Sequence, residues 1–133
     1  MTAATARPPG VLMGRTILIV DDSVVDRTRL QQILLASGHR VLAAESGEHA
    51  LALARSELPD LIFMDVAMPD LDGFVTTRCL KSDDRTRHIP VVFVTGAHQK
   101  ADMAWGHILG AQGFVAKPYT AEQILAQFEG VKR

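Results

Sequence analysis

A run of four apolar residues at positions 61–64, followed at once by Asp65, constrains the fold of this chain more than any other feature. The run contains no alternation of apolar and polar residues, so it predicts a strand buried on both faces, as in a parallel sheet covered by helices on each side. In open sheets of this kind, ligands bind beyond the carboxyl ends of the strands. The sequence therefore predicts that Asp65 ends a central strand at the edge where a function is expected.

Four further apolar runs are predicted to form strands of the same sheet, and they lie at positions 17–20, 41–44, 91–94 and 113–116. Segments with apolar residues at helical spacing separate these runs and follow the last one. A regular alternation of strands and helices is typical of the α/β class, in which right-handed crossovers join parallel strands. We therefore expect a three-layer sandwich, with one parallel sheet between two layers of helices.

Local signals mark where several helices begin and end. Ser23 is expected to cap the helix after the first strand, with the carboxylate of Asp26 in its first turn. Gly38 is expected to end that helix. Thr120 and Gln123 have the spacing of a capping box, which predicts the start of the last helix.

The helix predicted at about residues 100–109 contains two unusual residues. Gly106 inside a helix costs about 1 kcal/mol relative to alanine, so this helix is expected to be the loosest. Trp105 fits two interpretations, packing within the domain or contact with a partner protein, because tryptophan is enriched in binding hot spots.

The composition fits one domain that folds alone. The chain has 133 residues, of which 47% are hydrophobic, and this is enough to bury a core. The segment 1–14 contains prolines and glycines but no long apolar run, and it is predicted to be a flexible N-terminal tail. The domain is expected at 15–133.

Charge and hydropathy argue against several classes of function. The 14 basic and 15 acidic residues give a formal net charge of -1, and without a basic run we expect no binding to nucleic acid. No segment approaches the roughly 20 apolar residues of a membrane span, and none has the pattern of a signal peptide. We therefore expect no membrane insertion and a cytoplasmic location. Cys79 is the single cysteine, which excludes an internal disulfide and fits a reducing compartment.

Charged and hydroxyl side chains follow four of the five predicted strands. Because parallel strands end at one edge of a sheet, these side chains should gather there, and they are Asp21, Asp22, Asp65, Thr95 and Lys117. Clustered carboxylates repel one another, and an oxygen-only ligand set favours Mg²⁺ over zinc. A lysine ammonium and a threonine hydroxyl would complete a cage for a phosphoryl group, with Asp65 as the nucleophile.

Four segments carry a resemblance to a known family. They read Ile-Val-Asp-Asp at 19–22, Met-Asp-Val-Ala-Met-Pro-Asp-Leu-Asp-Gly at 64–73, Val-Thr-Gly at 94–96 and Ala-Lys-Pro at 116–118. With these segments the chain, from Thr16 to about Glu129, resembles the receiver domain of two-component response regulators. The resemblance implies a CheY-like, flavodoxin-like (βα)5 fold with strand order 2-1-3-4-5.

The resemblance also implies a set of metal and acceptor residues. Asp65 would accept a phosphoryl group from a histidine kinase. Asp22 would bind Mg²⁺ directly, Asp21 would bind it through water, and the backbone carbonyl of Ala67 would complete the metal site.

Further roles are implied by the same resemblance. Thr95 and Lys117 would contact the phosphoryl group, and the Lys117–Pro118 peptide bond would be cis. Thr95 and Phe114 would form the conformational switch. Because Phe114 lacks the hydroxyl that tyrosine carries in many relatives, the switch would work by burial of the ring alone.

Two short segments narrow the resemblance within the family. Ala-Trp-Gly at 104–106 and Gly-Ala at 110–111 are similar to stand-alone receivers of the chemotaxis-like systems that govern type IV pilus twitching motility. The resemblance thus implies a response regulator that switches its binding to a downstream target through the face of the fourth helix, fifth strand and fifth helix. Such a protein catalyses only its own phosphorylation and dephosphorylation.

Two alternative functions stay open at this point. A phosphate sink would drain phosphoryl groups from a kinase without a target of its own. A Mg²⁺-dependent phosphohydrolase would also use an aspartyl phosphate, but it would need a second acid at position 67, where this chain has Ala67. The small side chains of Ala67 and Ala97 suggest easy access of water to the phosphoryl group and hence a short-lived signal.

Overall fold

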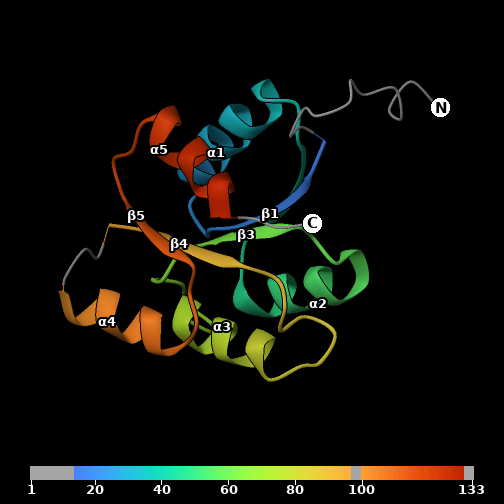
Figure 1. Cartoon of the computed structure of the whole chain (residues 1–133), viewed down its shortest axis with the longest axis vertical. Coiled ribbons are helices and arrows are strands. Elements are labelled where there is room, and N and C mark those ends of the chain that lie inside the picture. The colour runs from blue at the N-terminus through green and yellow to red at the C-terminus, as the bar shows by residue number, and fades with distance from the viewer. Residues whose placement is uncertain (1–13, 97–99, 131–133) are drawn as a thin grey trace.

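Five parallel strands form a single sheet in the order β2-β1-β3-β4-β5 (Figure 1). The computed structural model describes residues 14–96 and 100–130. The strands are β1 (Thr16–Val20), β2 (Arg40–Ala44), β3 (Leu61–Met64), β4 (Val91–Thr95) and β5 (Gly113–Ala116). The predicted strands and the strand order 2-1-3-4-5 are therefore confirmed. The predicted tail lies outside the described residues except for Gly14.

Helices cover both faces of the sheet and make the three expected layers. They are α1 (Val24–Ala36), α2 (Gly47–Glu57), α3 (Gly73–Lys81), α4 (Lys100–Ile108) and α5 (Ala121–Ala126). Figure 1 shows α1 and α5 on one face of the sheet and α2, α3 and α4 on the other. Within the described residues, none of these helices has the length and apolar character needed to cross a membrane.

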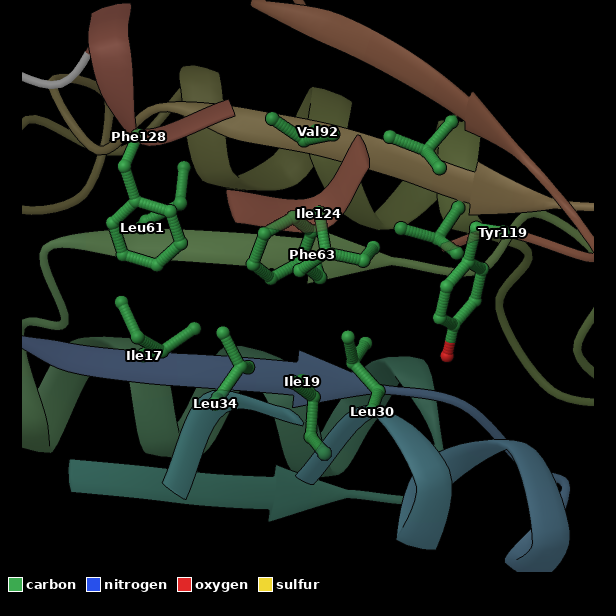
Figure 2. Close-up of a cluster of buried hydrophobic side chains, with 12 residues drawn as sticks. Ile17, Ile19, Leu30, Leu34, Leu61, Phe63, Val92, Tyr119, Ile124 and Phe128 are labelled. Carbon is green, nitrogen blue, oxygen red and sulfur yellow. The ribbon is translucent and has the colours of Figure 1, made fainter. Parts of the chain in front are cut away.

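The continuous apolar runs fill two cores because successive strand residues point to opposite faces. On β1, Ile17 and Ile19 pack beneath α1 and α5, in the cluster drawn in Figure 2. Leu18 and Val20, between and after them in sequence, join the second cluster beneath α2 and α3. Because side chains from both faces of β1 enter a core, residues 17–20 are all buried. This explains why apolar and polar residues do not alternate in this part of the sequence.

Capping signals in the sequence correspond to observed helix ends. The Ser23 side chain accepts a hydrogen bond from the backbone N–H of Asp26, and α1 stops before Gly38, which has a φ of 88°. Thr120 and Gln123 form the predicted capping box at α5. The last helix is shorter than its apolar spacing suggested, since Phe128 lies in a 3₁₀ turn, Gln127–Gly130, although its ring still joins the core.

Candidate functional site

Three carboxylates meet where β1 and β3 end. Val20 and Met64 are paired in register, so the residues that follow them, Asp21 and Asp65, emerge side by side. The backbone N–H of Asp65 donates to the carbonyl of Val20 at 2.9 Å, which continues the pairing by one residue. One carboxylate oxygen from each of Asp21, Asp22 and Asp65 lies within 4.8 Å of the others. Asp21 and Asp65 are buried, whereas Asp22 is exposed to solvent.

Lys117 brings a positive charge into this group of acids. Its Nζ donates hydrogen bonds to Asp21 Oδ2 at 2.8 Å and to Asp26 Oδ2 at 2.9 Å, and it lies 3.7 Å from Asp65 Oδ2. The backbone N–H of Lys117 donates to the carbonyl of Thr95 at 3.1 Å, which fixes the start of the loop after β5. The Lys117–Pro118 peptide bond is cis. The ammonium thus lies across the ends of β1 and β3.

Burial and charge shift the acid–base properties of the site. The pKa of the Asp65 carboxyl is raised from 3.8 to about 6, first by burial and then by the neighbouring Asp21 carboxylate. Lys117 and the backbone N–H of Val66 lower that pKa without cancelling the rise. For the Lys117 ammonium, burial lowers the pKa, but hydrogen bonds to Asp21 and Asp26 outweigh burial and leave it above its ordinary value. The acids therefore hold more negative charge than Lys117 alone neutralises.

Thr95 ends the strand between the acids and Lys117. It is buried, and it pairs in register with Ala116, the residue before Lys117. Thr95 and Lys117 therefore leave neighbouring strands at the same edge of the sheet as the carboxylates. All five predicted strand-end residues are found at this edge.

The loop from Asp65 to α3 depends on a glycine. The N–H of Gly73 donates to the carbonyl of Val66 at 2.8 Å, and a Cβ at position 73 would overlap the backbone carbonyl of Asp65. Asp72 caps α3 by accepting a hydrogen bond from the N–H of Val75 at 2.8 Å. Ala67 lies in this loop and is exposed. The Asp-Gly pair that ends the sequence segment 64–73 therefore turns the chain sharply beside Asp65.

Phe114 lies on β5 and packs toward α4. Its ring centroid is 5.2 Å from that of Phe93, in the core beneath α3 and α4. Gly106 of α4 lies against the same ring, and a Cβ at position 106 would overlap it. The ring is only partly buried, so part of it still reaches the molecular surface.

Sequence reasoning missed one residue of the site, Asp26. The sequence predicts Asp26 only as an acidic residue in the first turn of α1, yet its carboxylate is a direct partner of Lys117. A usable signal was its position, because α1 starts three residues after Asp21 at the edge where the parallel strands end. First-turn side chains of such a helix lie next to the strand ends.

Comparison with known proteins agrees with the fold. The response regulator receiver domain family matches residues 17–129. Protein PilH of Pseudomonas aeruginosa is 44% identical over 115 residues, which cover 86% of this chain and 95% of PilH. The solved structure of chemotaxis protein CheY4 of Vibrio cholerae aligns with a TM-score of 0.84 and 28% identity, over 90% of this chain and 99% of that one.

A further solved structure bears on the acidic group. It is the receiver domain of a sensor histidine kinase of Pseudomonas aeruginosa, with a magnesium ion coordinated in its active-site cleft. It aligns with a TM-score of 0.81 and 27% identity, over 87% of this chain and 96% of that one. On the match over most of its length, this chain belongs to the response regulator receiver domain family.

Proposed function

We propose that this protein is a phosphorylation-controlled switch, in which Asp65 accepts a phosphoryl group from a histidine kinase and the change alters binding to a downstream protein. The observation that carries the proposal is the Lys117 ammonium, which lies 3.7 Å from Asp65 Oδ2 and bonds to Asp21 at the same edge. A nucleophilic carboxylate, a fixed cation and further acids are the groups that phosphoryl transfer to an aspartate needs.

The acid group fits a magnesium ion. Receiver domains bind Mg²⁺ in an acidic pocket, and here three carboxylates offer oxygen atoms within 4.8 Å of one another. Asp21, Asp22 and Asp65 would hold the ion, with the backbone carbonyl of Ala67 as a further ligand. Hard oxygen donors and excess negative charge are what Mg²⁺ requires. When bound, the ion would neutralise the charge of the carboxylates and of the phosphoryl oxygens.

The transfer itself needs few groups of the protein. A carboxylate oxygen of Asp65 attacks the phosphorus of a phosphohistidine, an O–P bond forms as the P–N bond breaks, and the leaving imidazole retains the electron pair. Lys117 and Thr95 then contact the phosphoryl oxygens and stabilise their charge. Lys117 remains an ammonium throughout, as its raised pKa requires.

The output follows from the position of Phe114. Thr95 would move toward the phosphoryl group and Phe114 would turn further inward, which shifts an existing equilibrium between two surface shapes. The expected place of output is the face of α4, β5 and α5. A groove between β5 and α5 supports it, and this groove is lined by Phe114, Val115, Ala116, Gln123, Ala126 and Gln127. The identity to PilH supports a role in pilus-based motility.

The lifetime of the signal is a separate part of the proposal. Ala67 is exposed two residues after Asp65, and so small a side chain would shield the phosphoryl group poorly from water. We expect Ala67→Lys to slow hydrolysis of the phosphorylated protein several-fold, measured as loss of the phosphoryl group over time. An unchanged rate would remove this explanation. Ala97, the other small residue predicted to act in this way, lies outside the described residues.

One experiment separates the candidate functions. The protein is incubated with acetyl phosphate and Mg²⁺, and its intact mass is measured. A single phosphoryl adduct that is absent from Asp65→Asn supports the switch, whereas steady turnover of varied phosphomonoesters indicates a phosphohydrolase. Pull-downs with and without beryllofluoride then test for output, and capture of no protein in either form favours a phosphate sink.

A further inference from the structure

A fourth carboxylate, Asp26, shares the Lys117 ammonium with the acids at the strand ends. Asp26 Oδ2 lies 2.9 Å from Lys117 Nζ, nearly as close as Asp21 Oδ2 at 2.8 Å. The acceptor oxygen Asp65 Oδ2 is farther away, at 3.7 Å, beyond hydrogen-bond distance. In this state the ammonium is therefore hydrogen-bonded to Asp21 and Asp26 rather than to the acceptor.

The two hydrogen-bond partners of Lys117 differ in the cost of breaking their bond to the ammonium. The Asp21 side chain is 8% exposed, so loss of the ammonium would leave a buried carboxylate whose charge the remaining hydrogen bond, from the N–H of Ser23, does not neutralise. The Asp26 side chain is 40% exposed, so water can replace the ammonium there at little cost. Lys117 itself is tied at its backbone to Thr95. Asp26 is thus the partner that the ammonium can exchange for another anion.

We propose that Asp26 is a positioning residue that holds Lys117 in a resting place beside the acceptor and competes with the incoming phosphoryl group for the ammonium. The inference rests on the proposed function and deepens it. When the phosphoryl group arrives, Lys117 leaves Asp26 Oδ2 for a phosphoryl oxygen and Asp26 becomes hydrated. No proton moves, because Lys117 is an ammonium before and after.

The competition predicts a gain of function on removal of Asp26. Beryllofluoride with Mg²⁺ serves as the probe, since it occupies the place of a phosphoryl group on a carboxylate. Fluorine NMR gives its dissociation constant and the resonances of its fluorine atoms. We expect Asp26→Asn to bind beryllofluoride about two- to fivefold more tightly than the unaltered protein, the range expected for loss of a partly exposed ion pair.

A matched control separates the contact from the general effect of charge. Glu45 follows β2 at the same edge, is mostly exposed, and pairs with Arg27 rather than with Lys117. Glu45→Gln removes the same charge, so it should change the affinity less than Asp26→Asn does. In a Lys117→Gln background, Asp26→Asn should have no effect, because the competition acts only through the ammonium.

The variants test two separate claims, the role of Asp26 and the proposed function. If Asp26→Asn binds beryllofluoride no more tightly than the unaltered protein, or gains equally with and without Lys117, the role of Asp26 is wrong. If Asp65→Asn binds beryllofluoride as well as the unaltered protein does, the proposed function fails instead. Circular dichroism checks folding, and Asp26→Ala gives the same test should the asparagine variant unfold.

Discussion

Asp65 is a buried carboxylate next to a second carboxylate, and this makes its charge costly. Burial and then Asp21 raise its pKa from 3.8 to about 6. A carboxyl group whose pKa is higher in the folded than in the unfolded protein favours folding at low pH. Its favourable contribution is complete below pH 3.8 and is lost as the pH rises through about 6.

The Asp65→Asn variant should therefore be more stable than the unaltered protein in neutral and alkaline solution without Mg²⁺. A shift from 3.8 to about 6 corresponds to an upper limit of about 3 kcal/mol in the free energy of unfolding. Urea unfolding at about pH 8 and at about pH 4 measures the gain, which should fall to about a fifth at the lower pH. A gain of equal size at both pH values would show that it does not come from the charge of Asp65.

The pKa of His39 is shifted in the direction that favours folding at high pH, opposite to the effect of Asp65. His39 lies at the other edge of the sheet from the carboxylates of the site. It is buried at the end of the sheet where β2 begins, and its ring stacks on Phe128 with centroids 4.5 Å apart. Burial lowers its pKa below 6.5, Arg15 lowers it further, and Asp60 opposes the shift. The neutral form is therefore the one that fits the fold.

The protein should become less stable as the pH drops below 6.5. In this range His39 binds a proton more readily in the unfolded protein than in the folded protein. His39→Gln cannot titrate, so its melting temperature should depend less on pH between about 7.5 and 5. Thermal unfolding of both proteins across this range measures the difference. Parallel pH profiles would mean that other groups cause the loss.

At the scale of elements, α4 and β5 meet through a glycine and an aromatic ring. From sequence alone, Gly106 is simply a weak point in the helix, with a cost of about 1 kcal/mol relative to alanine. The structure shows why a glycine is needed at this position: a Cβ would overlap Phe114 and come within 3.3 Å of Phe93. The glycine therefore lets the ring lie against the helix backbone.

Gly106→Ala sets helix propensity against steric overlap. Overpacking in a core typically costs about 1–3 kcal/mol, which exceeds the roughly 1 kcal/mol that alanine gains in a helix. We expect a net loss of stability and a displaced Phe114 ring, measured by denaturant unfolding and by NMR of the ring protons. Gly96→Ala is the control, since among the described residues no atom outside its two chain neighbours lies within 4 Å of a Cβ at that position. A stabilised Gly106→Ala variant would show that the ring moves aside freely.

At this scale, the sequence predicts features that are set by residues close together in the chain. Buried strands are visible because both faces of β1 and β3 are apolar, and caps such as Ser23 act within one turn. The contact of Asp26 with Lys117 joins α1 to the loop after β5, and no local pattern encodes it. The fit of Phe114 to Gly106 is of the same kind, since it depends on how α4 lies over the sheet.

At the scale of the whole molecule, the strand order creates the site. Asp21 and Asp65 become neighbours because β1 pairs directly with β3, although β2 lies between them in sequence. Apolar periodicity predicts parallel strands but not which of them are adjacent, so the expected order came from the family resemblance. Among the described residues, the acids at this edge outnumber the cations, and the folded state should bind a divalent cation better than the unfolded chain does.

Binding of Mg²⁺ to the folded state should raise the melting temperature. At a concentration about tenfold above the dissociation constant, the gain is about 1.4 kcal/mol, or about 4–7 °C for a domain of this size. Asp22→Asn should remove most of the response, because it deletes the exposed member of the acid group. Asp84→Asn is the control, as Asp84 is exposed and pairs with Arg87 away from the strand ends. Equal losses in both variants would indicate screening of surface charge, whereas a loss confined to Asp22→Asn places the ion among the three carboxylates.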